Sequence, residues 1–380
     1  MRTISQGVCG VIPPHILTRV AEQTTEHQAR DDARSTLEQM RQLARERARS
    51  LHDAPAATKT APRKPRSVYD AGHSTKLPGK LAMSEHKPRS SDVEVTEAYD
   101  GCGAAFDFYA QVFSRNSIDD RGMRLVSTVH YGTRFDNAMW NGDQMVYGDG
   151  DGRLFNRLTA SLDVIGHELT HGVTQYTAAL GFSGENGALN EHISDAFGIM
   201  VKQFKLGQSA NESDWLIGAE LFTSGVHGKA IRSMAAPGTA YDDPILGRDP
   251  QPSHIRDYVD TPEDNSGVHI NCGIPNHAFY LAAIALGGKT WEVLGRIWYA
   301  TLTQRLTPGA GFDDFARATV DIAGELHGNG TGVQRTIAEA WSSVGLATRV
   351  FNTTRLSIKA PPGRSASVRK LPKWRRRTTL

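Results

Sequence analysis

The stretch Val164-Ile-Gly-His-Glu-Leu-Thr-His-Gly-Val173 constrains the fold of this chain more than any other. It contains His167-Glu168-Leu169-Thr170-His171, and residues four apart on a helix lie on one face. A helix here lets the two imidazoles converge on one zinc ion while the Glu168 carboxylate faces its open coordination position. The stretch therefore predicts a helix that carries a hydrolytic metal site.

A second stretch, Gly187-Ala-Leu-Asn-Glu-His-Ile-Ser-Asp-Ala-Phe-Gly198, supplies a third ligand. Glu191 and Asp195 again lie four apart, and the residues between His171 and Glu191 are enough for a turn that brings a second helix back alongside the first. Three protein ligands and a water are typical of a catalytic zinc site. Asp195 is expected to accept the free N–H of a ligand histidine and fix its tautomer. An ordinary polar helix face is the alternative, which the convergent spacing disfavours.

The composition is that of a globular protein. The chain has 380 residues, of which 39% are hydrophobic and 22% charged, enough for two domains with sizeable cores. No stretch approaches 18 consecutive apolar residues, which excludes a transmembrane helix. The apolar run at residues 1–14 is broken by Gln6, Gly7 and Gly10, so we expect no Sec signal peptide.

The cysteines and charges say little about partners. Cys9, Cys102 and Cys272 are far apart, which argues against a disulfide framework or a cysteine-rich metal site but leaves one bridge, and the redox compartment, open. The net charge is +2, but residues 355–380 hold nine Lys or Arg and no acid. The basic character therefore belongs to a tail, which predicts no specific nucleic-acid binding.

The chain divides into four predicted segments. Residues 1–66 form an N-terminal segment, extended to residue 17, then a mostly solvated helix from Thr18 to about Leu51 and a Pro-rich linker over 52–66. A lobe at 67–165 contains a helix over 97–113 and strands at 124–131 and 137–147. A second lobe at 166–347 is helical, with a loop-rich stretch at 207–268 and helices at 273–286, 289–306, 311–327 and 331–345. Residues 348–380 are expected to be a disordered basic tail. Strands followed by helices predict an α+β fold of two lobes with the zinc helix at their junction.

With both ligand motifs and their spacing, the chain resembles the thermolysin-like zinc metallopeptidases over roughly residues 67–347. The short N-terminal segment, and the likeness of Ile12-Pro-Pro-His-Ile-Leu17 to the short proline motif of their pro-segments, resemble the protealysin-type subgroup. The resemblance implies a β-rich N-terminal lobe, a helical C-terminal lobe and an active-site cleft between them. It also implies a removable pro-segment that covers the cleft.

The resemblance assigns roles residue by residue. It implies that the zinc ligands are His167, His171 and Glu191, that Glu168 is the general base and that Asp195 is the partner of His167. The segment Asp264-Asn-Ser-Gly-Val-His-Ile-Asn271 resembles the family segment whose histidine donates a hydrogen bond to the tetrahedral oxyanion. His269 takes that role here, and Asp264 orients it.

The resemblance also implies a substrate site. Asn137, Ala138 and Trp140 match the edge strand that pairs with extended substrate, and Arg232 matches the arginine that holds the substrate carbonyl. The positions matching the specificity pocket are all apolar: Phe155, Leu158, Val164, Ile217, Leu221 and Ile231. The expected cleavage is therefore on the N-terminal side of bulky hydrophobic residues such as Leu, Phe, Ile or Val.

Two departures from the family pattern affect the expected chemistry. Phe182 stands where the family usually has an oxyanion-stabilising tyrosine, which predicts a weaker oxyanion hole. The family's paired calcium site keeps Asp163 and Asp214, but the other matching positions are Lys202, Leu216 and Ala219, and a further calcium position is Lys229. A lysine places its own cation where calcium would sit, so Lys202 and Asp163 are expected to form an ion pair.

The expected protein is a zinc-dependent metalloendopeptidase made as a precursor, acting on peptides or proteins, bound by its own pro-segment, and monomeric. The alternative is a catalytically weak zinc-fold protein that binds peptides, for which Phe182 is the only hint; a basic-tail binding protein with a vestigial core is a third interpretation. A zinc aminopeptidase is disfavoured because no Gly-x-Met-Glu-Asn-like segment is present. No motif favours Cys9 as a zinc ligand in the latent state. Secretion by a non-Sec route is expected, with a cytoplasmic location as the alternative.

Overall fold

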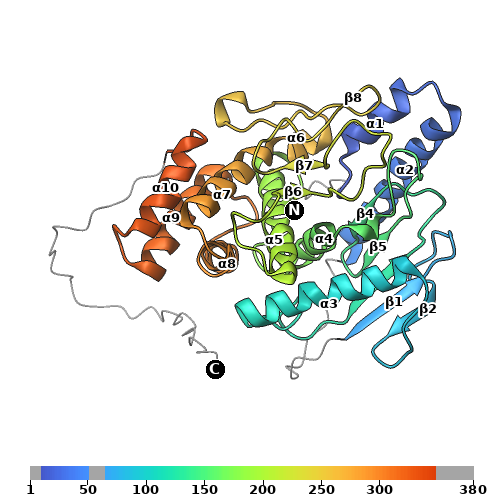
Figure 1. Ribbon diagram of the computed structural model, residues 1–380, viewed down its shortest axis with the longest axis horizontal. Coiled ribbons are helices and arrows are strands. Elements are labelled where there is room, and N and C mark those ends of the chain that lie inside the picture. The colour runs from blue at the N-terminus through green and yellow to red at the C-terminus, as the bar shows by residue number, and fades with distance from the viewer. Residues whose placement is uncertain (1–9, 51–64, 348–380) are drawn as a thin grey trace.

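The computed structural model describes residues 10–50 and 65–347 (Figure 1). Cys9, the tail at 348–380 and nearly all of the predicted linker lie outside these residues. Cys102 and Cys272 are buried as free thiols, so they do not form a bridge with each other. Within the described parts of the chain, no helix is both long enough and apolar enough to cross a membrane.

The N-terminal segment forms two helices, α1 (Pro14–Gln23) and α2 (His27–Ser50). The prediction of one helix from Thr18 was therefore wrong. Proline presets the helical φ at the start of α1, and Thr24 ends α1 in an extended conformation while its Oγ1 accepts a hydrogen bond from Glu26 N at 3.3 Å. The few apolar residues of α2 dock this helix on the rest of the protein, since Met40 and Leu43 are fully buried in the same core as the catalytic lobes.

The first lobe is built on a five-stranded sheet in the order β2-β1-β3-β5-β4. The strands are β1 (Arg66–Asp70), β2 (Lys80–Ser84), β3 (Leu125–Val129), β4 (Ala138–Trp140) and β5 (Met145–Tyr147). The β1–β3 and β3–β5 pairs are parallel, and the outer pairs are antiparallel. Helix α3 (Val93–Phe113) begins where Asp92 Oδ1 accepts Val95 N, and it packs along the sheet (Figure 1). This order leaves β4 as an edge strand facing the cleft.

The strand predicted over 137–147 is a hairpin. Asn141 Oδ1 accepts hydrogen bonds from the backbone N–H groups of Asp143 and Gln144, and Gly142 has φ +105°, a value that favours glycine. The turn limits β4 to three residues. The Asn141-Gly142 pair in the sequence is a typical hairpin signal.

The second lobe consists of helices around α5 (Figure 1). They are α4 (Leu162–Gln175), α5 (Gly184–Leu206), α6 (Asp264–Asn271), α7 (Gly273–Leu286), α8 (Leu294–Gln304), α9 (Phe312–His327) and α10 (Gly332–Ser343). Short elements between them are η1 (Leu158–Ala160), η2 (Ile255–Asp257), β6 (Leu216–Ile217), β7 (Arg232–Ser233), β8 (Asp242–Asp243) and β9 (Gly247–Arg248). The predicted helix at 273–286 is confirmed at both ends, whereas the next three are shorter than predicted. Helix α4 lies between the sheet and α5, at the junction of the two lobes.

Candidate active site

Two glycines bring α4 and α5 into close contact. A Cβ atom added to Gly166 would lie 3.1 Å from Gly198 Cα, and one added to Gly198 would lie 2.4 Å from Asp163 O. Only glycine allows the two backbones to approach this closely. The contact places His167 and His171 of α4 directly opposite Glu191 of α5.

The donor atoms of these three side chains form a small triangle. His167 Nε2 lies 3.1 Å from His171 Nε2 and 3.4 Å from Glu191 Oε2, and His171 Nε2 lies 3.5 Å from Glu191 Oε1. Zinc bonds of about 2.0–2.1 Å place tetrahedral ligand atoms roughly 3.3 Å apart. The donor set and its spacing therefore fit zinc, with one position left for water or substrate.

Both histidines are oriented by hydrogen bonds at their other ring nitrogen. His167 Nδ1 bonds to Asp195 Oδ1 at 2.8 Å, as predicted, and His171 Nδ1 bonds to Asn190 Oδ1 at 2.9 Å. These bonds leave each Nε2 to face the metal position. Sequence reasoning missed Asn190, although its place next to Glu191 on α5 was a usable signal.

Asp195 is itself held by several donors. Arg232 donates to both of its oxygens at 2.9 Å, and Asn276 Nδ2 donates to Oδ2 at 2.8 Å. Burial alone would raise the pKa of Asp195, but the charge of Arg232 and the bond to His167 hold this pKa below its usual value. Asp195 therefore stays ionised without access to water.

Glu168 is fully buried beside the donor triangle. Its Oε2 accepts a hydrogen bond from Trp140 N at 2.8 Å, and its Oε1 has no hydrogen-bond partner among the described residues. Burial raises the pKa of this carboxyl to about 7, against the opposing charge of His167 and the bond from Trp140. A carboxylate with this pKa can both take and return a proton near neutral pH.

His269 lies on the other side of Glu191. Its Nδ1 bonds to Asp264 Oδ1 at 2.6 Å, its backbone N–H donates to Asp264 Oδ2 at 2.8 Å, and its Nε2 lies 3.3 Å from Glu191 Oε2. Burial lowers the pKa of His269, but the charges of Asp264 and Glu191 outweigh burial and raise it. The raised pKa favours the protonated, donating imidazole. Left-handed backbone at Asp264, Asn265 and Ser266, with φ of 50°, 53° and 67°, turns the chain so that Asp264 can make both bonds.

The first described residues of the N-terminal segment lie against β4. Val11 N donates to Ala138 O at 3.2 Å, and Ile12 N donates to Asn137 Oδ1 at 3.0 Å. In return, Asn137 Nδ2 donates to Ile12 O at 2.9 Å and Arg232 Nη1 donates to Val11 O at 3.1 Å. Three of the predicted substrate-binding residues, Asn137, Ala138 and Arg232, therefore hold this segment, whereas the N–H of Trp140 donates to Glu168 instead.

The predicted pocket residues are all buried. Phe155, Leu158, Val164, Ile217, Leu221 and Ile231 are each at most 1% exposed, and they share one core with Val11, which is fully buried. Ile231 and Leu221 both lie against Gly218, where an added Cβ would meet them at 3.0 and 3.1 Å. The Val11 side chain is therefore enclosed in the same hydrophobic core as these residues.

Lys202 forms an internal ion cluster, as expected, at the position that matches the family's paired calcium site. Its Nζ lies 3.1 Å from Asp163 Oδ2, 3.1 Å from Asp214 Oδ2 and 3.8 Å from Glu220 Oε1. Glu220 was not predicted. The other matching positions, Leu216, Ala219 and Lys229, offer no carboxylate.

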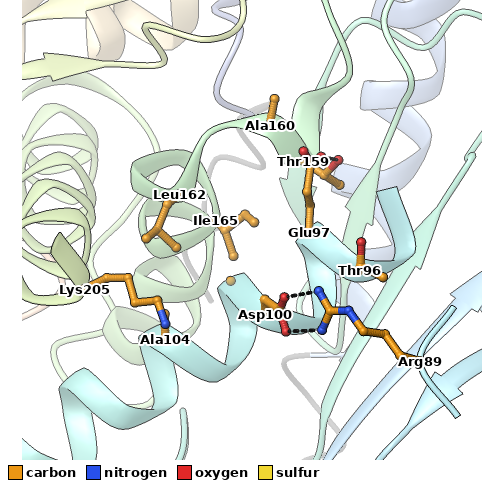
Figure 2. A pocket seen from close by; sticks show the side chains of 11 residues that line it. Arg89, Thr96, Glu97, Asp100, Ala104, Thr159, Ala160, Leu162, Ile165 and Lys205 are labelled. Atoms are coloured by element: carbon orange, nitrogen blue, oxygen red, sulfur yellow. Dashed lines mark hydrogen bonds and ion pairs between the residues drawn. The ribbon is translucent and has the colours of Figure 1, made fainter. Parts of the chain in front are cut away.

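Two further features lie away from the triangle of donor atoms formed by His167, His171 and Glu191. A pocket of about 240 Å³ lies between α3 and the start of α4 (Figure 2), and its apolar lining includes Gly101, Ala104 and Ile165. On its rim Arg89 pairs with Asp100, so the acid is already neutralised. It contains none of the predicted site residues.

The second feature is a polar cluster in which His130 lies between two carboxylates. Its Nδ1 bonds to Asp149 at 2.9 Å and its Nε2 to Asp92 at 3.0 Å, with Glu94 close by. The bond to Asp149, opposed by burial and aided by Asp92, raises the pKa of His130 to about 9. The imidazole is therefore protonated at neutral pH and links the sheet to the start of α3.

Comparisons with known proteins agree with this geometry. Two family models match the chain, the thermolysin metallopeptidase catalytic domain over residues 32–175 and its alpha-helical domain over residues 178–346. The chain belongs to the thermolysin family. An extracellular metalloprotease of Pectobacterium carotovorum subsp. carotovorum is 50% identical over 348 residues, covering 91% of this chain and 98% of the relative. Protease PrtS of Photorhabdus sp. (strain Az29) is 46% identical over 343 residues, covering 89% of this chain and 92% of the relative.

A solved structure places this thermolysin-family chain in the protealysin type. The structure is the precursor of protealysin, a metalloproteinase from Serratia proteamaculans. It matches with a TM-score of 0.80 and 48% identity, covering 89% of this chain and 100% of that chain. The predictions of a two-lobed α+β fold, of a zinc-dependent metallopeptidase and of the protealysin type are thereby confirmed, and the peptide-binding alternative is not favoured.

Proposed function

We propose that this chain is a zinc metalloendopeptidase made as a precursor, in which residues 1–66 are a pro-segment that blocks the cleft in cis. The observation that carries this proposal is the position of Gly10–Ile12, which lie against β4 and are held by Asn137, Ala138 and Arg232. The lobes would then be residues 67–165 and 166–347, with a tail at 348–380. Relatives named as extracellular proteases support action outside the cell.

The proposed zinc ligands are His167, His171 and Glu191, because the distances between their donor atoms are those expected around a tetrahedral zinc ion. When bound, zinc acidifies a coordinated water and polarises a substrate carbonyl. Glu168 takes the proton from the attacking water, since its pKa of about 7 suits a base near neutrality, and passes this proton to the leaving amine. His269, held by Asp264, donates a hydrogen bond to the oxyanion.

The specificity proposal follows from how Val11 is held. Its N–H and C=O are both fixed, by Ala138 O and by Arg232 Nη1, and its side chain is buried with the six apolar pocket residues. A substrate residue held in the same way would place a bulky apolar side chain there, just after the bond to be cut. We therefore expect cleavage on the N-terminal side of Leu, Phe, Ile or Val.

We also propose that no calcium is needed at the paired site, because Lys202 Nζ supplies the cation between Asp163 and Asp214. Calcium at this site would have too few carboxylate ligands, and the lysine charge would repel it.

The test uses purified full-length protein with zinc, followed by intact mass and by casein digestion. Wild type is compared with Glu168→Ala and with Glu292→Ala, a control glutamate on the surface. Wild type and the control are expected to lose an N-terminal fragment near residues 55–70 and to cut casein before bulky apolar residues, while Glu168→Ala stays intact. Zinc-loaded wild type that cuts neither itself nor casein would refute the proposal.

A further inference from the structure

The guanidinium of Arg47 is buried in the cleft against Phe182. Arg47 lies near the C-terminal end of α2, is 6% exposed, and its Cζ is 4.1 Å from the centroid of the Phe182 ring. Its backbone packs on the edge-strand turn, since a Cβ added to Gly142 would lie 3.2 Å from Arg47 Cα. Backbone and side chain together fix the guanidinium over the ring.

This place is next to the catalytic groups. The Phe182 ring centroid lies 6.4 Å from that of His171. Since the Arg47 guanidinium lies over this ring, it is also close to the His171 imidazole. The guanidinium therefore faces the site itself and not the outer surface of the pro-segment.

The direction of the bound N-terminal segment shows on which side of the scissile bond Arg47 lies. Gly10 lies against Met139, Val11 bonds to Ala138, and Ile12 bonds to Asn137, so the peptide runs antiparallel to β4. A substrate continuing in this direction toward its own N-terminus would pass from Met139 toward Gly142. Arg47 thus stands beside the positions that precede the scissile bond.

An arginine suits the face of a bare phenyl ring. The guanidinium is planar and weakly hydrated, so it stacks on aromatic faces at a lower desolvation cost than a compact ammonium. Phe182 presents this face without a hydroxyl group. The position where the family usually has an oxyanion donor is therefore used here for a cation–π contact.

We propose that Phe182 forms the floor of a guanidinium-binding subsite on the amino-terminal side of the scissile bond. Arg47 fills this subsite in the precursor, and an arginine side chain of the substrate fills it after the pro-segment is removed. The substrate part rests on the proposed peptidase function; the precursor part does not.

The precursor part is tested by hydrogen exchange of α2 in full-length protein carrying Glu168→Gln, which cannot process itself. We expect Arg47→Met and Phe182→Leu each to raise exchange in the last turns of α2 by about two- to five-fold, as loss of one cation–π contact implies. The double variant should exchange no faster than either single one. Phe182→Tyr keeps the aromatic face, and Arg45→Met changes an exposed arginine two residues away, so both should match the parent. Unchanged exchange in Phe182→Leu would overturn the subsite.

The substrate part is tested with self-processed protein and a mixture of synthetic peptides whose residues are varied at each position and include Arg, Lys and norleucine. The cleaved bonds are identified by mass spectrometry. Wild type and Phe182→Tyr should enrich Arg over Lys and norleucine by about two- to five-fold at one position before the cut, and Phe182→Leu should lose this enrichment. Equal frequencies in wild type and Phe182→Leu would overturn the substrate part. Absence of any cleavage would instead refute the peptidase function, and the exchange result alone would then decide the subsite.

Discussion

Replacement of Lys202 by methionine tests whether a side chain has taken over the role of calcium. The substitution keeps the length of the side chain but removes the charge between Asp163 and Asp214. Asp163 is fully buried, whereas Asp214 and Glu220 are each 45% exposed at the side chain. The cost of the change is therefore concentrated on Asp163, since the two exposed carboxylates are screened by water.

The magnitude follows from this geometry. Two unit charges 3.1 Å apart attract by about 5 kcal/mol at an effective dielectric constant of roughly 20. Removing one partner of a buried pair costs about 3–5 kcal/mol. Asp163 keeps hydrogen bonds from Gly218 N at 2.8 Å and from Ser161 Oγ at 3.0 Å, so we expect the lower end, about 3 kcal/mol. For a folded unit of more than 300 residues that lowers Tm by about 4–5 °C.

The assay is thermal unfolding in a Glu168→Ala background, which prevents self-digestion during heating. Lys205→Met, an exposed lysine on the same helix, is the matched control and should leave Tm unchanged. Calcium or a chelator should not move the Tm of the parent. Lys202→Glu should lower Tm without calcium and recover part of the loss when calcium is added, because it returns a carboxylate to the site.

Two results would refute this account of the site. A Lys202→Met variant with the same Tm as the Lys205→Met control would show that the ion cluster contributes nothing to stability. A parent protein whose Tm rises with added calcium, and falls with the chelator, would show that a metal binds despite the lysine.

Three other predictions use the same kinds of measurement. The pKa of His130, raised to about 9 mainly by Asp149, means that its stabilising charge is present below about pH 6.5 and is lost as pH rises through 9; the Tm advantage of wild type over His130→Gln should therefore shrink across that range. Asp195→Asn removes the carboxylate that orients a zinc-binding imidazole and should weaken zinc binding by about 10- to 100-fold, measured in competition with a metal indicator. Circular dichroism of the same variant would show whether its folding has changed. Val11→Asp puts a charge into an apolar pocket and should shorten the half-time of pro-segment loss, whereas Val93→Asp, at a site 49% exposed, should not.

The metal centre could be predicted because helix geometry is local. Once α4 and α5 are helical, the spacing of four residues dictates that His167 and His171 share a face, and the same holds for Glu191 and Asp195. Their convergence then depends only on two helices lying side by side. The distances between the donor atoms agree with that prediction, and the assigned catalytic roles stay predictions until the variants are measured.

What could not be predicted depends on contacts between distant parts of the chain. The parallel pairing of β1 with β3 and the burial of Arg47 against Phe182 join segments whose local sequences carry no sign of each other. The break after α1 was missed for another reason, since no glycine or proline marks it and the Thr24 side chain provides the turn. The hairpin at Asn141-Gly142 did have a local signal, since the Asn-Gly pair lies between two short apolar runs.

The contact between Gly166 and Gly198 also determines whether the metal can be released and rebound while the chain stays folded. Because two touching backbones set the distance between α4 and α5, the chain has already met the conformational cost of assembling the ligands when it folds. Small zinc domains that fold only around their metal behave in the opposite way. In this protein a chelator should therefore remove zinc without unfolding the chain, and inactivation should be reversed by adding zinc back. The fold makes the metal site, and the ion is an exchangeable part of it.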